Sequence, residues 1–274
     1  SRNEVGIEAF TPLQSIHSEW VALVPYGFIN QESSEVHFDV EWQWWGEKTR
    51  GILQNAQDAR IISQKIMIKP HIWIGRGDFT GQVEMTSEEK WKEFEVSYSK
   101  YILDFAKLAE ETNSEILCIG TELEKFIEHR PEFWLTLISE IKTIYKGKLT
   151  YAANWDEFKR TPFWNELDYI GVDAYFPVSD MQTPTIEDSK KGWIKHKKII
   201  EDISNKHDKP VLFTEFGYRS VDYTGKEPWR SERALKGLNL QAQVNTTQAL
   251  FDTFWEEDFW VFRYIAKRNS IPFY

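Results

Sequence analysis

Short apolar segments alternate with amphipathic ones along almost the whole chain, and this alternation constrains the fold more than any other feature. The apolar segments have the length of buried strands. Eight of them are expected to be strands: 5–10, 20–25, 65–74, 116–119, 149–153, 169–172, 211–213 and 259–264. The amphipathic segments are expected to be helices: 44–64, 87–111, 131–145, 188–205 and 231–254. Strands separated mainly by helices predict a parallel sheet with right-handed crossovers.

Eight strands in a chain of 274 residues fit a single (β/α)₈ TIM barrel over 1–274 better than an open doubly wound sheet. Neither G-x-G-x-x-G after the first strand nor a P-loop motif occurs, so a nucleotide cofactor has no support. The connection 11–19 is shorter than a crossover helix needs, and the chain after Trp260 has no clear final helix. We therefore expect the first and last units to be trimmed, or to be incomplete in this sequence.

Charge and cysteine content narrow the classes of partner. The net charge is −10 and Lys and Arg form no cluster, so nucleic acid is not an expected partner. No apolar run reaches the length of about 18 residues that a membrane span needs. The single cysteine, Cys118, excludes an internal disulfide and a multi-cysteine metal site, and the scattered histidines show no ligand spacing. We expect a soluble protein without metal or cofactor; secreted, periplasmic and cytoplasmic locations and the oligomeric state stay open.

Aromatic residues make up 15% of the chain, including 13 Trp, and many lie near the predicted strand ends. One interpretation is a Trp-rich core. The other is a carbohydrate site, because sugar rings stack their apolar C–H faces on aromatic planes while their hydroxyls need polar partners. Composition alone leaves both interpretations open.

Two glutamates each follow an apolar strand segment directly: Glu122 after the predicted fourth strand and Glu215 after the seventh. Active sites of (β/α)₈ barrels lie at the carboxyl ends of the strands. Retaining glycosidases need two carboxyl groups there, one as nucleophile and one as acid/base. The alternative is a pair of buried structural acids satisfied by Arg76 or backbone amides, since an unpaired buried carboxylate is costly. Two such acids among aromatic residues favour catalysis.

Five segments resemble the family-113 glycoside hydrolases. They are P-H-I-W-I-G-R-G-D-F at 70–79, G-T-E-L-E at 120–124, Y-A-A-N-W-D at 151–156, D-Y-I-G-V-D-A-Y-F-P at 168–177 and L-F-T-E-F-G-Y at 212–218. The resemblance extends from about residue 20 to 255. It implies a retaining (β/α)₈ glycosidase that acts mainly on β-1,4-mannan and manno-oligosaccharides.

The resemblance also assigns roles to residues. It implies that Glu122 is the acid/base and Glu215 the nucleophile. Thr121 stands where many relatives in the wider clan have Asn, and the aromatic wall expected on strand eight is represented only by Trp260. The residues expected to bind substrate are Trp73, Arg76, Asn154, Trp155, Asp173, Tyr175, Tyr218 and Trp260. Arg76, Tyr175 or Tyr218 is expected to keep Glu215 ionised.

The expected function is hydrolysis of β-linked mannan or manno-oligosaccharides by double displacement. Two alternatives stay open on the sequence. One is a retaining β-glycosidase acting on another β-glycan, such as glucan or xylan. The other is a non-catalytic barrel that binds carbohydrate and keeps the glutamates as hydrogen-bonding groups. Oligo- or polysaccharide is the expected partner in each case.

Overall fold

The computed structural model describes residues 7–15, 17–30, 33–75, 77–230, 237–261 and 265–267. The chain forms two compact units. The first consists of Ser1–Ala152, Arg160–Asp168 and Arg263–Tyr274, and the second of Ala153–Lys159 and Tyr169–Phe262. The predicted single domain over 1–274 stays a prediction.

Parallel strands form the centre of the first unit. In the order of their pairing they are β6 (Lys148–Asn154), β5 (Ile116–Thr121), β3 (Lys65–Ile68), β1 (Trp20–Leu23) and β9 (Ile265–Lys267). Only the last two residues of β6 belong to the second unit. β1 and β3 align Trp20 with Lys65, and the pairing of β5 with β6 shifts register between Cys118 and Thr121. β1 and β5 are buried along their whole length, as expected of parallel strands covered on both faces.

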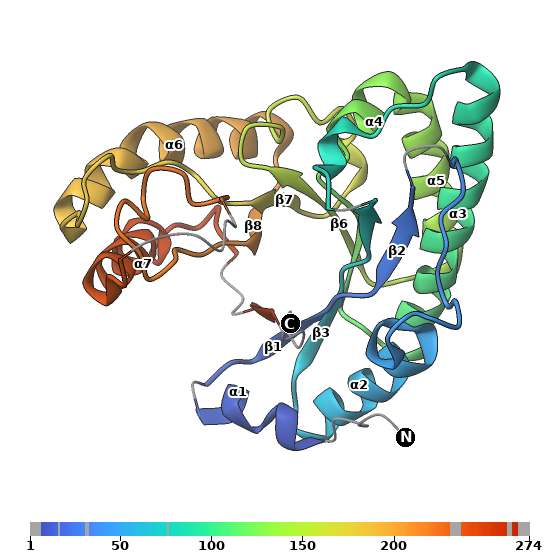
Figure 1. Ribbon diagram of the computed structural model, residues 1–274, viewed down its shortest axis with the longest axis horizontal. Coiled ribbons are helices and arrows are strands. Elements are labelled where there is room, and N and C mark those ends of the chain that lie inside the picture. Colours follow the sequence, from blue (N-terminus) through green and yellow to red (C-terminus); the bar gives the residue numbers. More distant parts are fainter. Residues whose placement is uncertain are drawn as a thin grey trace. The chain divides into compact units, whose positions relative to one another are not determined.

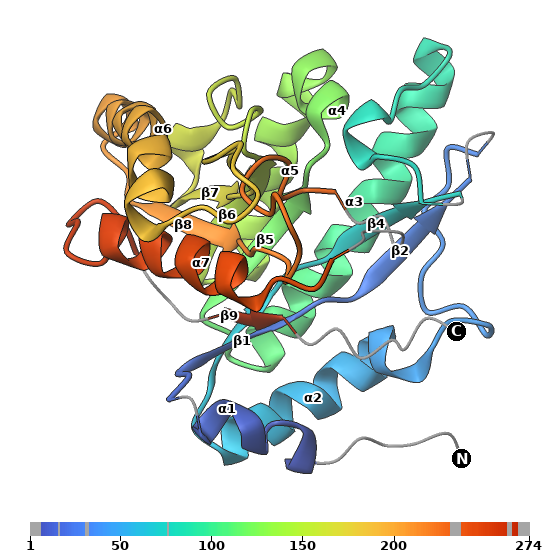
Figure 2. The same cartoon turned by 60° about the vertical axis from the view of Figure 1, so that its left-hand side comes forward.

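A separate two-stranded parallel sheet continues from this one. It pairs β2 (Tyr26–Ile29) with β4 (His71–Ile74), and Figure 2 shows the two strands side by side. Burial alternates along both strands: Gly27, Ile29, Ile72 and Ile74 are buried, whereas the residues between them are partly or fully exposed. One face of this small sheet therefore belongs to the core and the other is open.

Helices cover the strands of the first unit. They are α2 (Thr49–Ile61), α3 (Glu88–Glu111), α4 (Glu124–His129) and α5 (Pro131–Ile144). The Ser87 hydroxyl caps α3 by accepting the Lys90 N–H at 3.2 Å, and α5 starts with proline in its first turn. α3 packs beside α5, as Figure 1 shows. Their apolar faces bury Tyr98 and Trp134, whose rings meet edge to face at 5.5 Å.

The second unit has a smaller parallel pair and two long helices. β7 (Ile170–Asp173) pairs with β8 (Val211–Glu215), and α6 (Ile186–His207) lies beside α7 (Leu240–Phe254) in both views (Figures 1 and 2). A capping box formed by Thr185 and Asp188 starts α6. Trp193 of α6 is fully buried and meets Phe254 of α7 edge to face at 5.1 Å.

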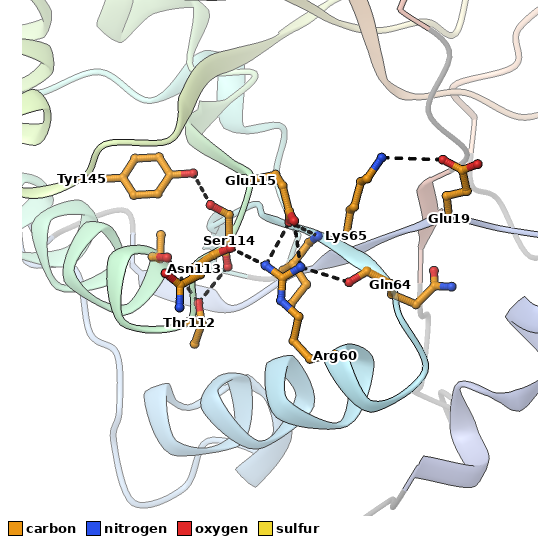
Figure 3. A network of polar contacts seen from close by, with 11 residues as sticks. Glu19, Arg60, Gln64, Lys65, Thr112, Asn113, Ser114, Glu115 and Tyr145 are labelled. Carbon is orange, nitrogen blue, oxygen red and sulfur yellow. Dashed lines mark hydrogen bonds and ion pairs between the residues drawn. The ribbon is translucent and has the colours of Figure 1, made fainter.

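A network of hydrogen bonds and ion pairs links the amino-terminal ends of β3 and β5 to the end of α2 (Figure 3). Arg60, at the end of α2, donates to both carboxylate oxygens of Glu115 at 2.7 and 3.0 Å and also to the Asn113 carbonyl. Glu115 precedes β5 and accepts the N–H of Ile66 in β3 at 2.7 Å. One carboxylate therefore joins a helix end to the starts of two neighbouring strands.

The predicted strand at 5–10 is wrong in the part that the structure describes. Ile7–Ala9 is a 3₁₀ helix, η1, and Thr11–Ser15 is a short helix, α1. Pro12 lies in the first turn of α1, where its missing N–H costs nothing, and Phe10 is buried. The apolar residues of this segment fit the pattern of a strand, although in the structure they lie in and next to short helices.

Other predicted boundaries also change. The segment 65–74 is two strands rather than one, because Lys69 and Pro70 separate β3 from β4 and Pro70 has no N–H to donate. β2 was not expected. The predicted helix 44–64 is a 3₁₀ turn, η2 (Trp45–Glu47), followed by α2. Of the predicted helix 231–254, residues 231–236 lie outside the description and α7 begins at Leu240.

The predicted eighth strand, 259–264, is only partly described. Its residue Trp260 forms an isolated parallel bridge with Val211 of β8. The Val211 N–H donates to the Phe259 carbonyl at 2.7 Å, and the Val261 N–H donates to the Val211 carbonyl at 2.8 Å. Residues 262–264 lie outside the description.

Candidate active site

Glu215 ends β8, the strand that the sequence counted as seventh. Its side chain is half-buried, and one carboxylate oxygen, Oε2, accepts a hydrogen bond from the Tyr175 hydroxyl at 2.8 Å. Tyr175 lies two residues beyond the end of β7, and a register shift between Val172 and Asp173 places Asp173 opposite Glu215. The carboxylate of Glu215 is therefore held at a strand end by a neutral donor from the neighbouring strand.

Asp173 supports this pair of strand ends from within. Its side chain is buried, and its Oδ1 accepts a hydrogen bond from the Thr214 hydroxyl at 2.7 Å. The Ala174 N–H donates to the Glu215 carbonyl at 2.7 Å. These bonds tie the ends of β7 and β8 together directly beside Glu215. The structure thus gives Asp173 a positioning contact.

Asn154 ends β6, Trp155 follows it, and both lie in the second unit. Asn154 accepts the Trp155 N–H at 2.8 Å, and its own N–H donates at 2.9 Å to the buried carboxylate of Glu157. This tight turn directs the Trp155 indole onto Trp229: the two rings stack with centroids 5.2 Å apart and an interplanar angle of 18°. The sequence did not indicate Trp229.

Tyr218 and Trp260, two further residues predicted to bind substrate, are buried. Burial raises the pKa of the Tyr218 hydroxyl well above its usual range, so this group is neutral. Trp260 packs edge to face on Phe213 at 5.4 Å and lies 5.5 Å from Phe254. The structure therefore places both rings within the core of the second unit, and their substrate contacts stay a prediction.

Glu122 directly follows β5, the strand that the sequence counted as fourth. It is half-buried and has a positive φ of 50°, a left-handed conformation that is uncommon for residues other than glycine. Its N–H donates to the Ala152 carbonyl at 2.8 Å, and the next N–H, of Leu123, donates to the Tyr151 hydroxyl at 2.6 Å. Backbone strain of this kind gathers at functional sites, where surrounding bonds hold it in place.

Aromatic rings pack closely around Gly120, two residues before Glu122. A side chain at Gly120 would bring its Cβ within 2.7 Å of the Tyr98 hydroxyl and 2.9 Å of the Trp134 ring, so only glycine fits. Glu124, two residues beyond Glu122, pairs instead with Arg160, as expected of a structural acid. Of the two neighbouring glutamates, Glu124 is thus engaged with a surface arginine, whereas the backbone of Glu122 is fixed at the end of β5.

Trp73 lies on the open face of the β2–β4 sheet. Tyr26, in the neighbouring strand, meets Trp73 edge to face at 6.2 Å and His71 at 5.4 Å. Trp42, 66% exposed, packs on Phe28 of the same face at 4.8 Å. The structure thus surrounds Trp73 with rings that the sequence did not connect to it. Arg76 lies outside the described residues.

The predicted site residues therefore divide between the two units. The second unit contains Asn154, Trp155, Asp173, Tyr175, Glu215, Tyr218 and Trp260, and the first contains Trp73 and Glu122. Among the described residues, no group of three or more His, Cys, Asp or Glu is placed to hold a metal ion. No helix in that part of the chain is long and apolar enough to cross a membrane.

Half-buried carboxylates at the ends of parallel strands, with aromatic rings beside them, are the site chemistry of α/β enzymes that cleave glycosidic bonds. The comparison with known families makes this specific. Residues 2–266 match the model of Glycoside Hydrolase Family 113, and the chain belongs to this family. The protein is thus a glycoside hydrolase. No protein in the curated set matches the chain significantly.

Solved structures show the same fold. A family-113 β-mannanase from Alicyclobacillus acidocaldarius, in complex with ManMIm, aligns with a TM-score of 0.82 at 23% identity, covering 95% of this chain and 80% of the other. A β-1,4-mannanase complex of the same family aligns with a TM-score of 0.78 at 23% identity, covering 95% and 84%. Two fungal β-1,4-galactanases align at 0.52 and 12%, covering 91% and 83%. The likeness confirms the predicted (β/α)₈ barrel class.

Proposed function

We propose that this chain is a retaining β-mannanase, which hydrolyses β-1,4-linked mannan or manno-oligosaccharides with Glu215 as nucleophile and Glu122 as acid/base. The observation that carries the reaction class is the family match over residues 2–266. The substrate rests on the likeness to solved β-mannanases. The hydrogen bond from Tyr175 to Glu215 supports the role of Glu215, because it stabilises the ionised form that attacks.

The reaction needs two displacements. In the first, the Glu215 carboxylate attacks the anomeric carbon while protonated Glu122 gives its proton to the departing glycosidic oxygen, which leaves as an alcohol. In the second, Glu122 removes a proton from water, the water oxygen attacks the anomeric carbon, and the bond to Glu215 breaks. The sugar leaves as a hemiacetal, Glu215 is again a carboxylate and Glu122 is again protonated.

Aromatic and amide residues supply the binding surface in this proposal. Trp73, with Tyr26 and Trp42, offers partly exposed ring surface on the β2–β4 sheet. Trp155 offers ring surface in the second unit. Apolar faces of sugar rings stack on such planes, which orients the chain without reading its hydroxyls. Specificity for mannan then depends on polar groups that meet the hydroxyls.

Replacement of each glutamate tests the assignment. We expect Glu122→Ala to lower kcat on manno-oligosaccharides by about 10²–10⁴-fold, the usual contribution of a general acid/base, and Glu215→Ala to lower it at least as much. Azide should restore turnover of an aryl β-mannoside by Glu215→Ala and give the α-azide, because azide then attacks once with inversion. Full activity of either variant would refute the assignment.

A matched control is available beside the acid/base. Glu124 pairs with Arg160 and is expected to have no part in the reaction, so Glu124→Gln should keep the wild-type kcat.

A panel of mannan, glucan and xylan separates the mannanase from a glycosidase acting on another β-glycan. Binding of these polysaccharides without release of reducing ends would favour a non-catalytic carbohydrate-binding barrel.

A further inference from the structure

Trp229 covers one face of Trp155, the tryptophan that the sequence predicted to contact sugar. The two indoles are nearly parallel, with centroids 5.2 Å apart. Trp155 is also in edge contact with Phe176 at 5.9 Å and is half-buried, whereas Trp229 is 42% exposed. Within this pair, the larger open aromatic surface therefore belongs to Trp229.

The position of Trp229 is fixed by its surroundings. The preceding residue, Pro228, is buried. Four residues before Trp229, the Gly225 carbonyl accepts the N–H groups of Val178 and Ser179 at 2.7 and 3.1 Å. A ring held by a buried proline and a bonded backbone loses little freedom when a ligand stacks on it, so little of the stacking energy is offset by lost entropy.

Two ring contacts, one step along the chain and one hydrogen bond link Trp229 to Glu215 within the second unit. Trp229 stacks on Trp155, Trp155 packs on Phe176, and Phe176 directly follows Tyr175 in the chain. The Tyr175 hydroxyl bonds to the Glu215 carboxylate. Trp229 is thus connected to the residue that bonds to the proposed nucleophile.

Two charged residues lie close to Trp229 in the sequence. Glu227 and Arg230, on either side of Trp229 in sequence, form an exposed ion pair at 2.9 Å. A ligand that fits this surface has an apolar face for the indole and hydroxyls at its rim for the charged pair. A pyranose ring has both, whereas an aliphatic ligand has no hydroxyls for the charged pair.

We propose that Trp229 is a substrate-binding residue, whose open face stacks on a sugar ring of the β-linked hexose chain while Trp155 supports it from behind. This inference rests on the proposed function and refines it. It moves a sugar contact from a residue at the end of β6 to a residue in the loop that follows the nucleophile strand, β8. The chain from β8 into this loop then supplies both the proposed nucleophile, Glu215, and a binding residue, Trp229.

Substitution of Trp229 tests the proposal, with Trp255 as the matched control. Trp255 is a 60% exposed tryptophan of the same unit that meets Phe251 edge to face at 6.3 Å. We expect Trp229→Ala to weaken mannohexaose binding and raise KM by about five- to twenty-fold, the scale of one aromatic stacking contact, with a much smaller change in kcat. Trp229→Tyr should keep most of the affinity, and Trp255→Ala should match wild type.

Binding is measured by calorimetry, and hydrolysis by release of reducing ends, for each variant on mannohexaose and on hexasaccharides of glucan and xylan. Active wild type with unchanged affinity and KM in Trp229→Ala would overturn the assignment of Trp229 and leave the proposed function in place. Wild type that binds a hexasaccharide without hydrolysis, and loses affinity in Trp229→Ala, would overturn the function and support Trp229. Failure to bind or hydrolyse any of these glycans would overturn both.

Discussion

At the scale of single residues, the hydrogen bond from the Tyr175 hydroxyl favours the ionised form of the half-buried Glu215 carboxylate. The phenol donates to Oε2 at 2.8 Å without bringing a charge. A neutral donor of this kind stabilises the ionised form of the carboxylate. The Thr214 to Asp173 bond next to it fixes the strand end that carries this donor.

Removal of the phenol oxygen should therefore slow the reaction without unfolding the protein. We expect Tyr175→Phe to lower kcat by about 10- to 100-fold, which corresponds to one hydrogen bond to a charged group. Steady-state kinetics on manno-oligosaccharides measure the change. Tyr223→Phe is the control, because Tyr223 is half exposed in the same unit. Equal kcat in Tyr175→Phe and wild type would show that the hydrogen bond has no role in the reaction.

Sequence and structure differ in what they reveal about single residues. Glu122 and Glu215 could be placed at strand ends from the sequence, because a carboxylate directly after an apolar strand is unusual and costly, and their catalytic roles stay a prediction. Trp229 could not, because it lies in a loop with no periodic pattern and its role depends on contact with a distant residue. Whether Trp260 points into a core or a cavity also depends on tertiary packing, and the structure buries it.

At the scale of elements, the amino-terminal ends of β3 and β5 depend on one partly buried ion pair (Figure 3). Arg60 and Glu115 are each about one-third exposed, so solvent screens their attraction only in part. The same Glu115 carboxylate accepts the Ile66 N–H, and Arg60 caps the Asn113 carbonyl. Loss of Arg60 would leave a carboxylate and a carbonyl with fewer partners.

We expect Arg60→Ala to lower the free energy of unfolding by about 1–2 kcal/mol, less than for a fully buried pair because of the exposure. Urea unfolding followed by circular dichroism measures the change. Lys107→Ala removes an exposed pair with Asp104 in the same unit and should change stability by less than about 0.5 kcal/mol. An equal effect of the two substitutions would contradict the special role of the Arg60 pair. Activity per folded molecule should stay unchanged in both.

Element boundaries show where periodicity is informative. α3 and α5 match their predicted ranges within one residue at each end, because a serine cap and a first-turn proline mark their starts. The segment 65–74 was predicted as one strand because both halves are apolar, and only Pro70 signalled an irregularity. The error at 5–10 has the same origin, since a few apolar residues fit a strand and a short helix equally well.

At the scale of the whole molecule, the alternation of strands and helices was enough to predict the barrel class, which the likeness to family-113 structures confirms. The parallel orientation of the strands could be predicted because helices separate most of them along the chain. The separate β2–β4 sheet could not be predicted, because only the pairing partner distinguishes its strands from those of the main sheet. The family resemblance could be recognised from motifs at strand ends, and the match over residues 2–266 confirms it.

The stereochemistry of hydrolysis tests the proposed double displacement by Glu215 and Glu122. Two displacements at one carbon restore its configuration, so we expect cleavage of a β-mannoside to give the β-anomer of the product first. Proton NMR of the anomeric signals during the first minutes, before mutarotation, distinguishes the anomers. Glu124→Gln should give the same first anomer as wild type. Appearance of the α-anomer first would mean that water attacks directly, with Glu215 as a base rather than a nucleophile, and would refute the double-displacement mechanism.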